Sequence, residues 1–129
     1  MTLIEALVAL VVLSVGLLGI AGMQMTTLRN NLGAHFRSQA TVLAYDITDR
    51  MRANRDRAIG NNYLVGFGAA PTGSLIEQVD LRTWKTTLTN PLPSGDGRIE
   101  RVGNTFRITI RWTEPNVATP QTFVTHTQI

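Results

Sequence analysis

The first part of the chain is almost uninterrupted apolar sequence. Between Ala6 and Thr27 there is no charged residue, and every Lys and Arg lies at Arg29 or later. A run of about 20 apolar residues is long enough to cross a bilayer as a helix, so this segment predicts a membrane span. It lacks the basic start and the small-residue cleavage site of an ordinary secretory signal. Either the span inserts without a basic flank, or a basic leader is removed ahead of Met1.

After this segment the apolar residues recur every three or four positions, which is the spacing of one helix face. The residues on this face are Leu28, Leu32, Phe36, Ala40, Leu43, Ile47 and Met51. The other faces carry two opposite-charge pairs at i,i+4 spacing, Asp46–Arg50 and Arg52–Asp56. Gly60-Asn61-Asn62 is a stop signal. We therefore expect one helix from Thr2 to about Ala58, whose second half suits the back of a sheet.

Glycine and proline residues predict a loop over residues 60–74, which we interpret as a flexible connection. A short helix is expected next, because Ser74 and Glu77 have the spacing of a capping box. Trp84 lies on the apolar face of this helix and is expected in the core. Pro91 forbids continuation of the helix.

The last third of the chain reads as strands. Apolar and polar residues alternate strictly over residues 105–112, which is typical of a half-buried strand. Gly103-Asn104 is a candidate two-residue hairpin turn, and residues 121–128 form a weaker last strand. The pattern predicts an α+β fold with three or four antiparallel strands. Its two parts are a hydrophobic helix half over residues 1–28 and a globular head over residues 29–129.

The hairpin turn also predicts which residues face one another. It places Ile99 opposite Ile108 on the core side of the sheet. It places Glu100 opposite Arg107 on the solvent side, where opposite charges stabilise the strand pair.

Glu5 is the one charged residue among the first 28. A carboxylate at the edge of a membrane span is costly, and it is therefore a functional hypothesis by default. The local alternative is a capping box between Thr2 and Glu5, at a helix start that favours negative charge. The two roles can coexist.

Gly16, Gly19 and Gly22 lie three residues apart within the apolar helix. Each glycine inside a helix costs roughly 1 kcal/mol relative to alanine. One interpretation is close helix packing through small residues. The other is local flexibility of the helix when it moves from lipid into an assembly.

No residue cluster indicates catalysis or a bound cofactor. The chain has no cysteine and two histidines, His35 and His126, too few and too far apart for a metal site. Asp80, Asp96 and Glu114 read as isolated loop or cap carboxylates. A calcium site around Asp96 stays an open alternative, although calcium needs six or more oxygens and only Asp96 stands out. We expect a protein that is not an enzyme and has no cofactor or metal.

Three arginines, Arg98, Arg107 and Arg111, are expected on the solvent side of the sheet. They are candidate contacts for DNA phosphates. We favour a solvated arginine and threonine face instead, because no aromatic residues are interleaved for base stacking.

A family resemblance is carried first by the N-terminal run, residues 2–22. Its sequence is T-L-I-E-A-L-V-A-L-V-V-L-S-V-G-L-L-G-I-A-G. It closely resembles the mature N-terminus of type IV pilins and pseudopilins, most of all the PilV-type minor pilins. The first residue of that family is usually Phe, whereas here it is Met1.

Later segments are similar to other motifs of the same family. Ala53-Asn54-Arg55 resembles its A-N-R, and Ile108–Trp112 resembles its V-T-V-x-W strand. Leu81–Trp84 and Leu92–Gly97 resemble its L-x-x-W and L-P-x-G-x-G stretch. The resemblance therefore covers nearly the whole chain.

The resemblance implies the pilin fold, in which a long N-terminal helix packs on a small antiparallel β-sheet head. It implies that prepilin peptidase cuts a leader ahead of Met1 and that the new N-terminus is methylated. It also implies that Glu5 pairs with the N-terminal amine of a neighbouring subunit. The partners would be other minor pilins and the major pilin, through helix–helix contacts.

The function implied is that of a minor pilin that primes type IV pilus assembly within a tip complex. The subunit would cross the inner membrane of a Gram-negative bacterium once, with a periplasmic head, before it enters the extracellular pilus. Two alternatives remain: a type II secretion pseudopilin, which a Met first residue favours, and a DNA-binding minor pilin.

Overall fold

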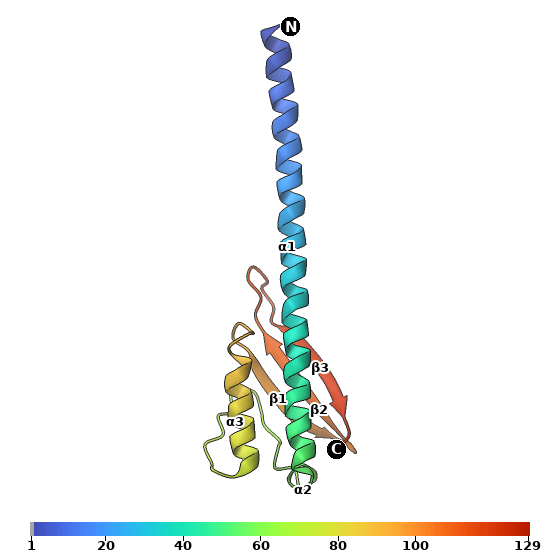
Figure 1. The fold of residues 1–129 in the computed structure, drawn as a ribbon, viewed down its shortest axis with the longest axis vertical. Helices are drawn as coiled ribbons and strands as arrows, with labels where there is room; N and C mark the ends of the chain where they lie inside the picture. Colours follow the sequence, from blue (N-terminus) through green and yellow to red (C-terminus); the bar gives the residue numbers. More distant parts are fainter. Residues whose placement is uncertain (1) are drawn as a thin grey trace. The chain divides into compact units, whose positions relative to one another are not determined.

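A computed structural model of the chain describes residues 2–129. Within these residues the fold is α+β, with one long N-terminal helix and a small three-stranded antiparallel sheet (Figure 1). The helices are α1 (Leu3–Ala53), α2 (Arg55–Ile59) and α3 (Ile76–Leu88), and the strands are β1 (Asp96–Val102), β2 (Thr105–Trp112) and β3 (Gln121–Thr127). The chain divides into two compact units, Met1–His35 and Phe36–Ile129.

The long helix ends earlier than the sequence predicts. It stops at Ala53, and the short α2 follows after Asn54, whose backbone leaves the helical region at φ −118° and ψ 51°. The Asn54 side chain donates to the Tyr63 hydroxyl at 3.0 Å. Asparagine competes with helical hydrogen bonding in this way because its short side chain offers alternative partners. The predicted stop at Gly60–Asn62 is confirmed as a turn, with Asn61 at φ 65°.

The early end of α1 changes one predicted ion pair. Asp46 and Arg50 pair at 3.2 Å, as expected. Arg52, however, pairs with Asp49 at 3.5 Å rather than with Asp56, because Arg52 and Asp56 do not share one continuous helix. That expectation was wrong.

The predicted hairpin is confirmed residue by residue. β1 and β2 pair with Ile99 opposite Ile108 and Glu100 opposite Arg107. Gly103 occupies the first turn position at φ 61°, the conformation that a type II′ hairpin requires there. β3 then pairs antiparallel with β2, so the strand order is β1-β2-β3.

The core of the second unit lies between this sheet and the helices α1 and α3. Both helices lie on the same side of the sheet in Figure 1. The buried residues include Phe36, Ala40, Leu43, Ile47 and Met51 from α1, Leu81, Trp84 and Leu88 from α3, and Ile99, Phe106, Ile108, Ile110 and Trp112 from the sheet. The second half of α1 is therefore part of the head's core. Leu28 and Leu32 lie on the same predicted stripe but are exposed.

Trp84 is fully buried, as predicted, and its indole N–H donates to the Leu43 carbonyl at 2.8 Å. Its ring packs against the backbone of Gly97 in β1, where a Cβ atom would overlap the indole. Only glycine at this position lets α3 approach the sheet so closely.

The helix α3 does not begin with the predicted capping box. Its N-cap is Leu75, and no side chain caps it. Glu77 is instead buried, and its carboxylate lies 3.5 Å from the Arg57 guanidinium. A buried carboxylate needs a charge partner, and Glu77 has Arg57 as its partner instead of the backbone near Ser74. Its second oxygen, Oε2, is buried without a hydrogen-bond partner among the described residues.

The loop after α2 is tied to the sheet. Val65 and Ile99 exchange both backbone hydrogen bonds, at 2.9 and 3.2 Å. This bridge pairs the outer edge of β1 at Ile99 and positions the loop. The prediction of a flexible connection did not anticipate this contact.

Candidate functional site

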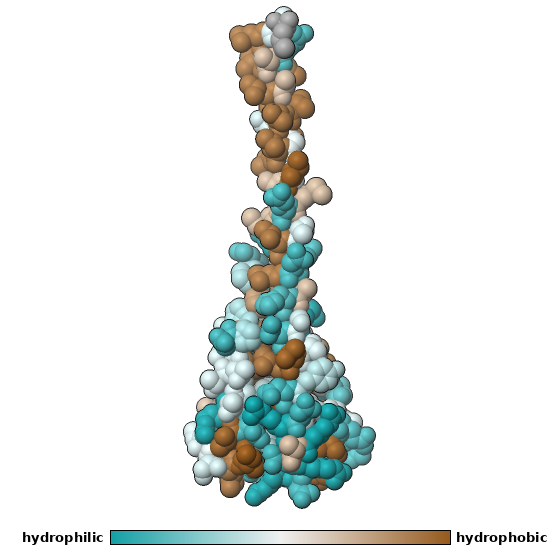
Figure 2. Space-filling view, in the orientation of Figure 1, coloured by the Kyte–Doolittle hydropathy of each residue, from teal (hydrophilic) through white to brown (hydrophobic). Residues whose placement is uncertain are grey.

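The first unit presents a continuous apolar surface. Each large apolar side chain from Leu3 to Leu28 is more than half exposed, and Figure 2 shows these residues as a brown surface. Soluble monomers rarely expose an apolar area this long, and such areas mark membrane or protein contacts. The helix is long and apolar enough to cross a membrane once.

Glu5 and Thr2 form the predicted capping box. The Thr2 backbone N–H donates to Glu5 Oε2 at 2.7 Å, and the Glu5 N–H donates to Thr2 Oγ1 at 3.3 Å. The first cationic side chain along the helix is Arg29, and 24 residues correspond to about 36 Å of helix. The cap therefore orients Glu5 while no cation on α1 neutralises its charge. Met1, the other residue of the expected assembly contact, lies outside the described residues.

Gly16, Gly19 and Gly22 all lie within the unbroken α1 helix. A Cβ at any of the three would meet no atom within 4 Å. No packing contact among the described residues therefore requires glycine at these positions. Helix packing would involve other chains and local flexibility would involve the helix backbone itself, so both interpretations stay predictions.

The three predicted arginines lie together on the outer face of the sheet. Arg107 and Arg98 contact the same Glu100 carboxylate, at 2.7 and 3.2 Å. The Arg107 hydrogen bond lowers the pKa of Glu100 below its usual value. Arg111 lies 3.5 Å from Asp96. All three arginines are thus held by carboxylates of the same face, and phosphate contact stays a prediction.

An aromatic ring that the sequence analysis did not single out joins this face. The Arg98 and Arg111 guanidinium groups both lie over the ring of Phe67, a loop residue, at 4.9 and 4.0 Å from the ring centroid. Cations at this distance are attracted to the ring face. The contact fixes both arginines against the sheet.

Asp96 is not the isolated carboxylate that the sequence suggests. Its oxygens accept from Lys85 Nζ at 2.7 Å and from the Gly68 and Gly97 backbone N–H groups at 2.8 Å each. Burial alone raises the pKa of Asp96, but these hydrogen bonds outweigh burial and hold the pKa below its usual value. The Lys85 ammonium already neutralises this carboxylate, so the geometry does not favour calcium there.

Asp80 was also wrongly read as isolated. It is buried on α3 and accepts from the Tyr63 hydroxyl at 2.6 Å, from Arg50 at 3.1 Å and from Asn54 at 3.4 Å. Burial, followed by the Asp80 hydrogen bond, raises the pKa of Tyr63 well above its usual value. This network joins α1, the loop and α3, and Asn54, the centre of the A-N-R motif, belongs to it. Glu114 likewise has a partner, the Trp112 indole N–H at 3.2 Å.

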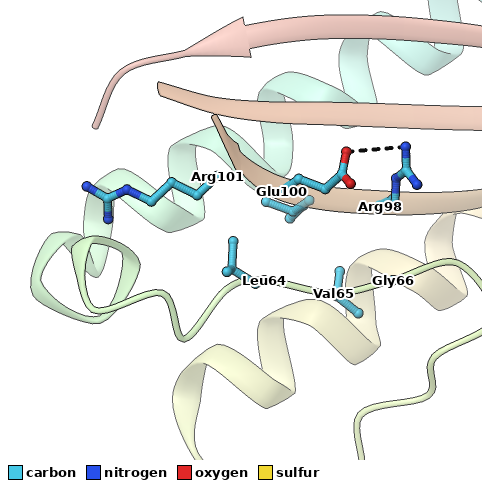
Figure 3. Close-up of a pocket in the computed structure, with 7 residues that line it drawn as sticks. Leu64, Val65, Gly66, Arg98, Glu100 and Arg101 are labelled. Carbon is cyan, nitrogen blue, oxygen red and sulfur yellow. Dashed lines mark ion pairs between the residues drawn. The ribbon is translucent and has the colours of Figure 1, made fainter. Parts of the chain in front are cut away.

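A shallow groove of about 390 Å³ runs between the loop and β1 (Figure 3). Leu64 and Val65 form its loop side, and Arg98, Glu100 and Arg101 line the strand side. The Arg101 guanidinium turns away to bond the Ile59 carbonyl at 2.8 Å. The groove brings no nucleophile and base together, so its chemistry is that of a surface contact.

Among residues 2–129 no group of three or more His, Cys, Asp or Glu side chains is arranged to hold a metal ion. No family model, curated protein or solved structure matches this chain.

Proposed function

We propose that this chain is a minor pilin of a type IV pilus system, a structural subunit that helps to prime filament assembly. The observation that carries the proposal is Glu5, a lone carboxylate held by its cap at the start of an exposed apolar helix. The α+β architecture, with a long N-terminal helix and a small sheet, is compatible with a pilin-like fold and supports the proposal.

The mechanism follows from the two environments that α1 would occupy. Before assembly the apolar half lies in the inner membrane, with the head in the periplasm. During assembly it leaves lipid and enters a bundle of similar helices, so one apolar environment replaces another. Small residues such as Gly16, Gly19 and Gly22 let helices approach closely in such a bundle.

Glu5 supplies specificity to this exchange. In the bundle it would pair with the N-terminal amine of a neighbouring subunit. Removing one partner of a buried ion pair costs about 3–5 kcal/mol, because the other charge remains buried and unpaired. A subunit that lacks the carboxylate therefore stays in the membrane rather than joining the filament.

The test compares Glu5→Ala with Thr2→Ala in cells that carry the other pilus subunits. We expect Glu5→Ala to remain in the membrane fraction and to be depleted at least tenfold from sheared filaments. Thr2→Ala removes the capping hydroxyl but keeps the carboxylate, and should be incorporated nearly normally. Recovery of Glu5→Ala in filaments at the wild-type level contradicts the proposal. Equal losses in both variants would reduce the role of Glu5 to helix capping.

A further inference from the structure

The two edges of the sheet differ. The outer edge of β1 is paired at its centre, where Ile99 forms a bridge with Val65 of the loop. β3 forms the opposite edge, and within residues 2–129 its backbone pairs only with β2. Figure 1 shows β1 beside α3 and β3 at the far side of the sheet.

The alternation of hydrogen bonds identifies the outward backbone groups of β3. Ile99 bonds outward to Val65, so its neighbour Glu100 bonds inward to Arg107 of β2. Ile108 then bonds to the opposite side, toward its β3 partner Thr125. It follows that Val124, and with it Thr122 and His126, direct their N–H and C=O groups away from the sheet.

The sequence of this edge carries none of the features that usually protect an exposed strand, and the Arg52 side chain of α1 contacts it only at its last residue, Thr127, at 3.2 Å. Proteins block such edges with lysines, prolines, inward charges or bulges. β3 has the sequence Q-T-F-V-T-H-T, without Lys, Arg, Asp, Glu or Pro. Its pairing with β2 runs from Phe106–Thr127 to Trp112–Gln121 without a bulge. The edge is therefore free of bulges and open to a further strand.

The outer face beside this edge is positively charged. Arg98, Arg107 and Arg111 lie against two carboxylates, Asp96 and Glu100, so three positive and two negative charges of the strands leave an excess of one. Lys85 of α3 adds a second cation against Asp96, at the β1 side of the sheet. Arg111 and Arg107 lie directly opposite Thr122 and His126 of β3. On the other face, Phe123 is half-buried against the core.

We propose that the edge of β3 binds an extended strand of a different protein by β-strand addition. Backbone hydrogen bonds would hold the strand about 4.8 Å from β3. Its alternate side chains would be apolar on the side of Phe123 and acidic on the side of Arg107 and Arg111. The proposal does not depend on the pilin assignment, because the edge belongs to the head and Glu5 takes no part in it.

The experiment uses the full chain in detergent micelles and a labelled eight-residue peptide of alternating Val and Glu, followed by fluorescence anisotropy. Three comparisons accompany it. The first is the same peptide N-methylated at every second residue, the second a Val and Lys peptide, and the third the Val124→Pro variant. The proline removes an N–H that faces outward, and edge strands tolerate this.

We expect the Val and Glu peptide to bind, with at least tenfold loss on N-methylation and on Val124→Pro. The Val and Lys peptide should bind more weakly, by a ratio that shrinks with added salt. The proposal is overturned if the Val and Glu peptide does not bind at millimolar concentration. It is also overturned if the N-methylated peptide or the Val and Lys peptide binds as tightly as the Val and Glu peptide. A wild-type chain that dimerises while Val124→Pro stays monomeric overturns the choice of partner, because the occupant is then a second copy.

Discussion

Replacement of Asp80 by alanine tests whether the buried polar network holds the head together. The Tyr63 hydroxyl is fully buried and donates to Asp80 at 2.6 Å. Without the carboxylate its proton has no acceptor, which costs about 1–3 kcal/mol. The Arg50 side chain is 35% exposed and keeps its ion pair with Asp46 at 3.2 Å. Loss of the Arg50–Asp80 ion pair therefore costs about 1 kcal/mol or less. The sum is about 1–4 kcal/mol, a substantial part of the 5–15 kcal/mol that stabilises a typical domain.

The measurement is urea unfolding of the full chain in detergent, followed by tryptophan fluorescence. Trp84 and Trp112 are both fully buried in the head and report on it directly. The control is Tyr63→Phe, which removes the hydroxyl together with the proton that it donates to Asp80 and should cost about 1–2 kcal/mol.

The double variant Asp80→Ala/Tyr63→Phe is the measurement that could refute this account. It contains no orphaned hydroxyl, so its loss should be smaller than the sum of the single losses by about 1–2 kcal/mol. Strict additivity, or a loss below about 1 kcal/mol for Asp80→Ala alone, would falsify the account of the network.

Two further predictions concern the same core. The pKa of Tyr63 is raised in the folded head, so the unfolded chain releases the hydroxyl proton at lower pH than the folded chain does. Above about pH 10 the free energy of unfolding should therefore fall by about 1.4 kcal/mol per pH unit. In urea titrations at alkaline pH, Tyr63→Phe should remove this pH dependence, whereas Tyr45→Phe should keep it. Gly97→Ala should lower the free energy of unfolding by about 1–3 kcal/mol, because the added Cβ overlaps Trp84. The control is Gly66→Ala, where a Cβ meets nothing within 4 Å. Equal melting temperatures for the two variants would contradict the packing argument.

The sequence predicted those parts of the fold that depend on local periodicity. The period of two over residues 105–112 and the Gly103-Asn104 turn determined the register of β1 and β2, because a hairpin with a two-residue loop leaves no freedom in pairing. The apolar helix and the Thr2–Glu5 cap were predicted for the same reason: each depends only on residues close in sequence.

Contacts between residues that are distant in sequence could not be predicted from local periodicity. Asp80 and Asp96 carry no local signal that distinguishes a buried hub from a surface carboxylate. Their partners, Tyr63 and Lys85 among them, come from other elements. The early end of α1 has the same origin, since the Asn54 side chain is drawn out of the helix pattern by Tyr63.

The burial of Phe36 to Met51 against the sheet has a practical consequence for work with soluble fragments. A fragment that starts just before Phe36 lacks the exposed apolar segment of α1 and retains every α1 side chain that is buried in the head. A fragment that starts a few turns after Phe36 lacks part of the α1 contribution to this core, and aggregation of such a fragment would say nothing about the native protein.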